Sequence, residues 1–238
     1  MFGMRSYFLL FYFFATSISQ VFAQDIIRPA YWTRYSNELD WGKASVQTEL
    51  DNRRYISPHT QLQFIGRVSA NYKFQEWLTA GLGFAYSNAT IRPFGLFVPE
   101  FRPHQELQLT HQAGKVEVSH RLRFEQRYSR DSLEQKLISE SIIALRGRYR
   151  LQGNYHLIKS PKEKGYLGFS ANTESFLTHQ EGDLSYSEFR LYAAVKQQPF
   201  SNVAFELGLM YLHEWNSSRP DIRFYTLRFS VRHYLSWD

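Results

Sequence analysis

The 238-residue chain contains no cysteine, only eight prolines and only 13 glycines. Without cysteine it can form neither a disulfide framework nor a thiolate-ligated metal or iron–sulfur site. So little proline and glycine excludes a collagen-like or low-complexity chain, and a hydrophobic content of 43% excludes a disordered one. No run of about 18 apolar residues follows Gln24, so the sequence contains no transmembrane helix.

Charge of neither sign dominates, because 28 basic residues stand against 22 acidic ones. This excess gives a formal net charge of +6 and does not argue for a nucleic-acid partner. Aromatic residues make up 17% of the chain, yet its mean hydropathy is −0.44. A chain that is both aromatic-rich and polar favours a protein with an aromatic outer band and a wet interior.

The N-terminal segment resembles a secretory signal peptide. Arg5 precedes the apolar run Tyr7–Phe14, and Val21–Ala23 forms a small-residue cleavage site before Gln24. The alternative, a membrane anchor, needs about 20 apolar residues, and this run is too short. We therefore expect residues 1–23 to be a cleaved signal peptide and residues 24–238 to form the mature domain.

The mature chain alternates between apolar and polar residues with a period of two. In Lys115–Tyr128 the even positions are mostly apolar and the odd positions are charged or polar. The same alternation, with the apolar residues at odd positions, recurs in Ile143–Leu157 and Tyr225–Arg232. A period of two places the two sets on opposite faces of β-strands. Eleven such segments can be counted: 31–40, 44–55, 60–74, 77–89, 104–113, 115–128, 139–157, 165–177, 184–197, 201–214 and 221–235.

Segment length and spacing predict the fold. Most segments exceed the ~5–6 residues of a typical soluble strand and satisfy the ~9–11 residues of a tilted membrane strand. Tight turns, such as Gly114, alternate with longer loops. The expected loops are Ile56–His59, Thr90–Pro103, Ser129–Ile138, Thr178–Asp183 and Trp215–Pro220. This predicts an all-β fold, an antiparallel transmembrane β-barrel of about 10–12 strands. Because bacterial single-chain barrels have even strand numbers, we expect 10 or 12 rather than the 11 counted.

A soluble β-sandwich is the alternative fold, because its strands also alternate. Its outer face would carry scattered charge, whereas the polar face here repeatedly places arginine beside glutamate or aspartate in adjacent segments. The last strand, from Tyr225, ends close to the aromatic Trp237, as outer-membrane strands do for recognition by the barrel assembly machinery. The loop Thr90–Pro103 contains three prolines and three phenylalanines. It could plug the lumen, lie on the membrane, contact a partner, or simply continue its flanking strands.

The polar face predicts a structural network of charges inside the barrel, because buried charges must be paired. The same arginine row could instead line an anion pore or dock an anionic lipid headgroup. The residues assigned to this lumen charge network are Glu106, Glu117, Arg121, Arg123, Glu125, Arg146, Arg148, Arg150, Glu188, Arg190 and Glu206.

Three motifs resemble a known family. They are Tyr31–Tyr35, with its Trp-Thr-Arg centre, Glu49–Tyr55, and Arg121–Arg127, which reads Arg-Leu-Arg-Phe-Glu-Gln-Arg. They are similar to those of domain of unknown function 2490, exported proteins mostly expected to be outer-membrane barrels of Bacteroidetes-type bacteria. The resemblance implies the fold and the location for nearly the whole mature chain, and it implies no activity.

No catalytic signature stands out, since the chain lacks a nucleophile elbow, a phosphate loop and the usual metal-binding motifs. His111 and His120 occupy the apolar phase of one hairpin, and their pairing places them too far apart for one constellation. We expect a non-enzymatic outer-membrane barrel of a Gram-negative bacterium, structural or a narrow conduit, without catalytic, metal or cofactor sites. Its expected partners are outer-membrane lipid and the barrel assembly machinery, with no nucleic acid and no identifiable solute. A lipid-acting outer-membrane enzyme and an exported ligand-binding β-sandwich are the alternatives.

Overall fold

The computed structural model describes residues 26–91, 96–133, 136–159, 166–215 and 220–236 as an all-β protein. The predicted signal peptide, residues 1–23, lies outside these ranges. Within them, no helix has the length and apolar character needed to cross a membrane. The strands are β1 (Ile26–Trp41), β2 (Ala44–Tyr55), β3 (Gln61–Gln75), β4 (Leu78–Ile91), β5 (Leu96–Ala113), β6 (Val116–Leu133), β7 (Lys136–Lys159), β8 (Tyr166–Gln180), β9 (Asp183–Phe200), β10 (Val203–Glu214) and β11 (Ile222–Ser236).

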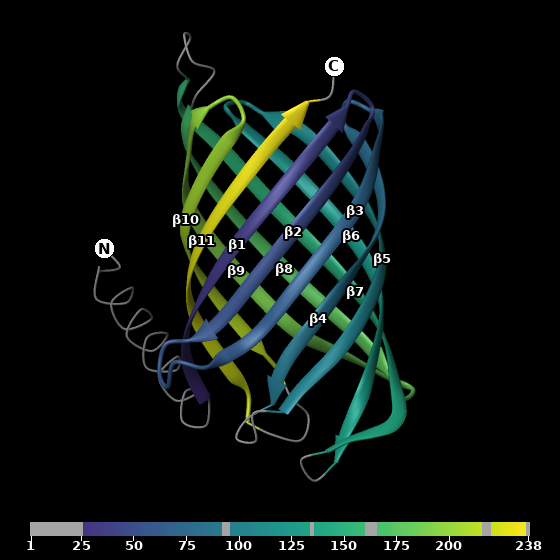
Figure 1. The fold of residues 1–238 in the computed structure, drawn as a ribbon. Coiled ribbons are helices and arrows are strands. Elements are labelled where there is room, and N and C mark those ends of the chain that lie inside the picture. The colour runs from purple at the N-terminus through teal and green to yellow at the C-terminus, as the bar shows by residue number, and fades with distance from the viewer. Residues whose placement is uncertain (1–25, 92–95, 134–135, 160–165, 216–219, 237–238) are drawn as a thin grey trace, which may run out of the picture.

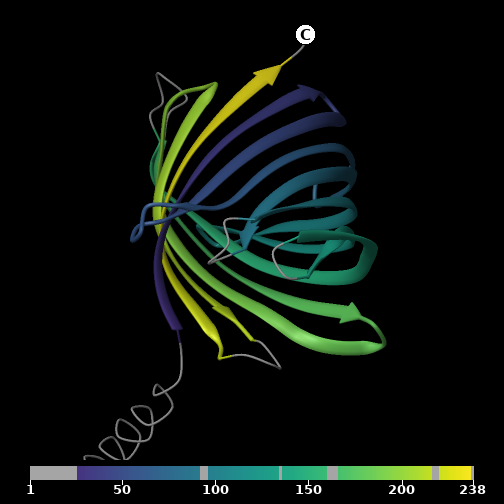
Figure 2. The same ribbon diagram turned by 60° about the horizontal axis from the view of Figure 1, so that its bottom comes forward.

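The strands form one closed barrel in which each strand pairs with its neighbours in sequence (Figures 1 and 2). The count of 11 segments is confirmed, and the expectation of an even number is wrong. Strands that alternate in direction leave the first and the eleventh parallel, so β1 closes the ring against β11 by a parallel ladder. This ladder runs without interruption from Ile26 opposite Ile222 to Asp40 opposite Ser236. A single closed sheet also excludes the β-sandwich.

Most connections at one end of the barrel are two-residue turns, whereas most of those at the other end are longer. We call the end at which β1 finishes and β11 finishes the turn end, and the other the loop end (Figure 1). At the turn end, Gly42 and Gly114 each occupy the first position of a two-residue turn with a positive φ of 80° and 63°. Glycine adopts this conformation without steric cost, which permits the tightest hairpins.

Some expected loops are instead parts of strands. Strand β5 begins at Leu96 and β6 runs to Leu133, so much of Thr90–Pro103 and Ser129–Ile138 belongs to extended hairpins. Only Glu181 and Gly182 separate β8 from β9. Leu96–Pro103 pairs with β4 along its length, so this part of the segment continues the flanking strands. The turn-like prolines masked an alternation that in fact continues through Glu100, Phe101 and Arg102.

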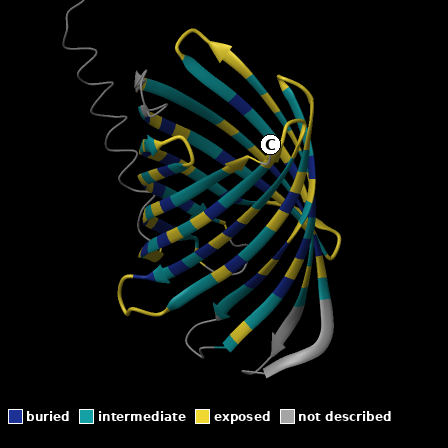
Figure 3. Cartoon of the chain, turned by 45° about the horizontal axis from the view of Figure 1, so that its top comes forward, coloured by how far each residue is buried: buried dark blue, intermediate teal, exposed yellow. Residues whose placement is uncertain are grey.

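Side chains of opposite character face the two sides of the barrel wall. On β6, Leu122 and Phe124 are 56% and 43% exposed. Their neighbours Arg123 and Glu125 are buried, with only 6% and 3% of their surface exposed. Exposed and buried residues therefore alternate along the strands in Figure 3. Apolar side chains cover the outside, and charged side chains fill much of the inside.

Strand β4 makes room for these long inward side chains. Its inward positions carry small residues, among them Gly81, Gly83 and Ala85. A Cβ at Gly83 would lie 2.8 Å from the imidazole of His104. That imidazole, on neighbouring β5, is 2% exposed. The glycine therefore creates the space into which the histidine packs.

One part of the inner wall carries apolar side chains, although the composition predicts a wet interior. A buried cluster lies on inward positions of β9, β10, β11, β1 and β2. Its members are Ala30, Trp32, Tyr55, Tyr192, Ala194, Met210, Leu212 and Phe224. The lumen thus has a mainly charged wall on β5 to β8, whereas on these other strands apolar side chains lie among charged ones such as Arg34 and Asp51.

Candidate functional site: the charged lumen

Two glutamates, one on each strand flanking β7, are the centres of the charged wall. Glu125 of β6 accepts hydrogen bonds from Arg146 and Arg148 of β7, the latter at 2.6 Å. Glu174 of β8 accepts from Arg148 and from Arg121, both at 2.9 Å. Register places these strands side by side, with Glu125 opposite Arg146 and Arg150 opposite Glu174. Each carboxylate therefore accepts hydrogen bonds from two guanidinium groups, and Arg148 links the two centres.

Strand β5 extends the network through two further glutamates. Glu106 accepts two hydrogen bonds from Arg123, at 2.9 and 2.6 Å. Glu100 accepts from Arg102 at 2.7 Å and also pairs with Arg127. These side chains are largely shielded from solvent. Water therefore screens the Coulomb attraction within each pair only weakly.

The opposite side of the lumen holds a second group of ion pairs, on β1 to β3. Arg34 makes a bidentate contact with Asp51, with distances of 2.5 and 2.7 Å. Asp51 is 1% exposed and also lies 3.4 Å from Arg53. Glu49 pairs with Arg67. Bidentate arginine–carboxylate contacts are among the strongest polar contacts and fix both side chains.

The remaining residues assigned from the sequence have varied contacts. Arg190 pairs with Glu188 on the same strand. Glu206 accepts a hydrogen bond from the Tyr192 hydroxyl at 2.7 Å and lies 3.9 Å from Arg228.

Glu117 and Arg150 have no ion pair within 4 Å among the described residues. Glu117 instead accepts a hydrogen bond from the amide of Asn154 at 3.0 Å. Arg150 lies near the turn end, where it lines a cavity with Arg121 and Gln152. The ion pairs thus concentrate around the middle of the barrel rather than along its full height.

Aromatic rings belong to the lumen as well, which sequence reasoning missed. Phe176 is 1% exposed, and the guanidinium carbons of Arg146, Arg148 and Arg190 lie 5.4, 4.7 and 4.6 Å from its ring centre. Such contacts stabilise a cation against a ring face. The signal was available, because Phe176 follows Glu174 by two residues and therefore shares its inward phase.

Trp32 is the second such ring. It is 3% exposed, with the guanidinium of Arg53 at 3.8 Å and that of Arg190 at 5.3 Å from its ring centre. The inward phase of β1, from Arg34 back to Trp32, predicts this placement.

The lumen contains two principal cavities, and no lining residue is common to both. The cavity at the turn end has a volume of about 450 Å³ and includes Arg34, Glu49 and Arg150 in its lining. The cavity at the loop end has a volume of about 360 Å³ and includes Arg53 and Arg102. Among the side chains that are under 2% exposed are Phe176, Ile65, His104, Thr226 and Asp51, all on inward positions.

Histidines on the outer wall form pairs that were not expected. The imidazoles of His111 and His120 stack with ring centres 5.5 Å apart, so the expectation that they lie too far apart is wrong. His111 pairs in register with Val118, and a diagonal neighbour on an antiparallel sheet lies within reach of a ring. His120 also contacts the Tyr149 hydroxyl at 2.8 Å. Within the described ranges, no group of three histidine or acidic residues could hold a metal ion.

Comparison with known proteins agrees with the motifs. The model of the family described as protein of unknown function DUF2490 matches residues 30–223, which span β1 to the start of β11. No curated protein and no solved structure gives a significant match. The matched region contains strands β2 to β10, most of β1 and the central ion pairs just described. The chain therefore belongs to the DUF2490 family.

Proposed function

We propose that this protein is a non-enzymatic outer-membrane β-barrel of a Gram-negative bacterium, serving as a structural element or a narrow conduit. The observation that carries the proposal is the sidedness of the wall. Leu82, Leu122 and Leu209 point outward and are 63%, 56% and 68% exposed, while arginines and glutamates are buried within. Water would favour the reverse arrangement, and a hydrocarbon environment favours this one.

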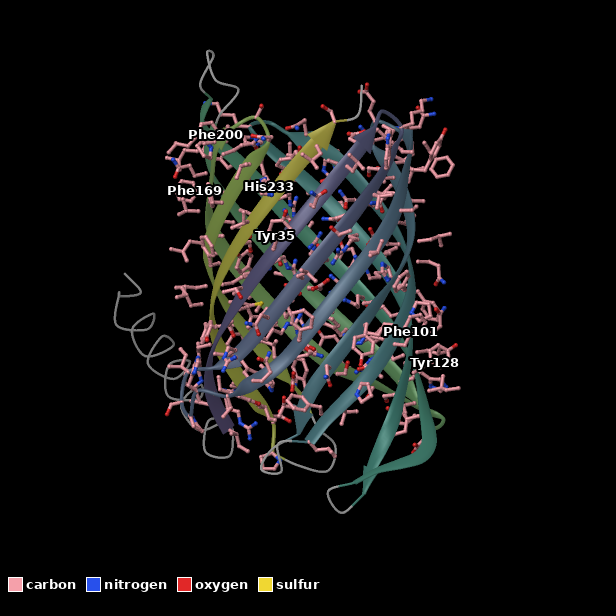
Figure 4. All side chains as sticks on the ribbon, in the orientation of Figure 1. Tyr35, Phe101, Tyr128, Phe169, Phe200 and His233 are labelled. Carbon is pink, nitrogen blue, oxygen red and sulfur yellow. The ribbon has the colours of Figure 1, made fainter. Side chains whose placement is uncertain are left out.

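Strand length and aromatic residues support a membrane setting. The shortest strands, β2 and β10, have 12 residues, against the ~9–11 that a tilted membrane strand needs. Phe169 and Phe200 project outward near the turn end, and Phe101 and Tyr128 project outward nearer the loop end (Figure 4). Aromatic residues near both ends of an apolar band match the two interfacial girdles of membrane barrels.

The lumen supports a narrow or closed passage. About eight strands leave room only for packed side chains, whereas 16–18 leave an aqueous channel, so 11 strands lie between these cases. Here long arginine and glutamate side chains meet at mid-height, between two cavities with separate linings.

The proposed partners are outer-membrane lipid around the wall and the barrel assembly machinery, which would recognise the alternating strand β11. The proposed signal peptide, residues 1–23, provides export.

Fractionation of a Gram-negative host that expresses the full chain tests the proposal. We expect the protein in the outer-membrane fraction, soluble only in detergent, and migrating differently on gels before and after heating. A chain lacking residues 1–23 is the matched control and should remain inside the cell. Recovery of the full chain in the soluble periplasmic fraction would refute the membrane assignment.

A further inference from the structure

The cavity at the loop end of the lumen has an unbalanced lining. It has a volume of about 360 Å³, and eight arginines but only two glutamates line it. Several carboxylates that pair with these arginines, including Asp51, Glu100 and Glu125, are not part of the lining. These carboxylates therefore contact the arginines from outside the cavity, and the charged groups of the lining are mainly guanidinium groups.

The cavity also has an apolar side. Trp32, Leu212 and Phe224 line it from β1, β10 and β11, and each is at most 4% exposed. Tyr55 stacks on Phe224 with ring centres 6.2 Å apart and extends this surface. Arg102 and Arg127 face the cavity from β5 and β6, on the charged wall. One ligand in this space would touch both rings and guanidinium groups, because arginines line the cavity from both walls and Arg53 lies against Trp32.

Buried donors around the cavity lack acceptors. The indole Nε1 of Trp32 and the Nε atoms of Arg53, Arg102 and Arg148 have no hydrogen-bond partner among the described residues. All four residues line the cavity and are at most 9% exposed. Each atom can only donate, and leaving a buried donor unpaired is costly. These four nitrogen atoms are themselves shielded, so a ligand would meet the guanidinium groups that line the cavity, and arginine is the side chain best suited to bind an anionic group with its several acceptor oxygens.

We propose that the loop-end cavity binds a small organic anion, a phosphate, sulfonate or carboxylate group carried on a ring or short apolar body. An engineered apolar cavity of about 150 Å³ accommodates benzene, so this larger space admits a fused ring and its anionic group. A diacyl lipid is far too large for it. The inference goes beyond the proposed membrane role and concerns the barrel interior, whichever environment surrounds the wall.

Calorimetric titration of the purified, detergent-solubilised full barrel tests this inference. The probe is 1-naphthyl phosphate, which carries both the anion and the ring. Inorganic phosphate and 1-naphthol each carry one half, and a titration into detergent alone corrects for partition into micelles. We expect 1-naphthyl phosphate to bind one site per barrel, at least tenfold more tightly than either partial probe.

Two variants locate the site. Arg53→Gln removes a cavity guanidinium, and Asp51 keeps its bidentate partner Arg34. Trp32→Phe keeps an aromatic ring but removes the indole N–H together with part of the ring surface. We expect at least tenfold weaker binding for Arg53→Gln and a smaller loss for Trp32→Phe. Arg228→Gln, on the lining of the turn-end cavity, is the matched control and should bind as the parent does.

Several results would overturn the inference. These are no binding of 1-naphthyl phosphate, equal binding of inorganic phosphate or 1-naphthol, or equal losses in the Arg53 and Arg228 variants. If Arg53→Gln does not fold, as judged by unchanged gel migration on heating, Trp32→Phe decides alone. Unaltered affinity in that variant would then reject the site. Because binding is measured on the isolated barrel, a negative result leaves the membrane assignment untouched.

Discussion

Removing the carboxylate of Glu125 should destabilise the barrel more than removing that carboxylate together with a partner. Glu125 is 3% exposed and is the one acid within 4 Å of Arg146 among the described residues. Arg148 by contrast also contacts Glu174 at 2.9 Å. In Glu125→Gln, Arg146 therefore becomes a buried charge without an ionic partner, whereas Arg148 retains one.

The size of the effect follows from this geometry. Breaking a buried pair by removing one partner costs about 3–5 kcal/mol, because the remaining charge is uncompensated. The double variant Glu125→Gln/Arg146→Met removes both charges, and we expect it to recover about half of that loss. Arg146→Met alone should cost least, because Glu125 keeps the 2.6 Å contact from Arg148.

Urea unfolding of the barrel in lipid vesicles, followed by tryptophan fluorescence, measures these differences. Glu76→Gln, an exposed carboxylate in the turn between β3 and β4, is the control and should change the free energy of unfolding by less than about 0.5 kcal/mol. If Glu125→Gln is no less stable than the double variant, the carboxylate does not compensate buried charge and the reasoning fails.

Three other predictions concern facing and passage. Leu122→Arg places a charge on the outer wall, at a cost of roughly 2–4 kcal/mol at mid-membrane, and should impair assembly far more than Arg123→Gln. Equal assembly yields of the two variants, measured on heated and unheated gels, would contradict the assignment of Leu122 to the outer face and Arg123 to the lumen. Phe176→Ala empties a fully buried site and should lower the free energy of unfolding by about 3–5 kcal/mol in the urea assay, and a loss below about 1 kcal/mol would contradict its packed position. In planar bilayers the purified barrel should show small or no conductance, and large steady porin-like currents would show that the ion-paired middle is open.

The fold was largely predictable because strand alternation is a local property of the sequence. Each of the 11 segments could be recognised from its own residues, without knowing its neighbours. Barrel closure was predicted, but the parallel pairing of β1 with β11 was not, because the count of 11 segments was set aside in favour of the even number typical of bacterial barrels. Hairpin length was also missed where prolines such as Pro99 and Pro103 suggested a loop, although both residues pair with β4 as parts of a strand.

The charged character of the lumen was predictable from the sequence, but the individual contacts within it were less so. Phase alone places Arg123 and Glu125 on the same face, but partner choice depends on strand register and side-chain reach. Arg102 and Glu100 were overlooked because they lay in a segment read as a loop. The apolar inner wall was missed because Met210 and Leu212 lie between outward leucine and tyrosine residues, so β10 reads as apolar on both faces.

Because β1 and β11 pair in parallel, the start of the first strand and the end of the last strand lie at opposite ends of the barrel. The chain enters the barrel at Ile26 at the loop end and leaves it after Ser236 at the turn end. In a barrel with an even number of strands, both extremities would lie in the same compartment. In the outer membrane proposed here, with the turn end in the periplasm, an epitope tag before Ile26 would be reachable by antibody on intact cells. A tag after Ser236 would become reachable only once the envelope is permeabilised. Anything joined to the start of the first strand would therefore be displayed to the exterior, while the other extremity stays with the periplasmic machinery.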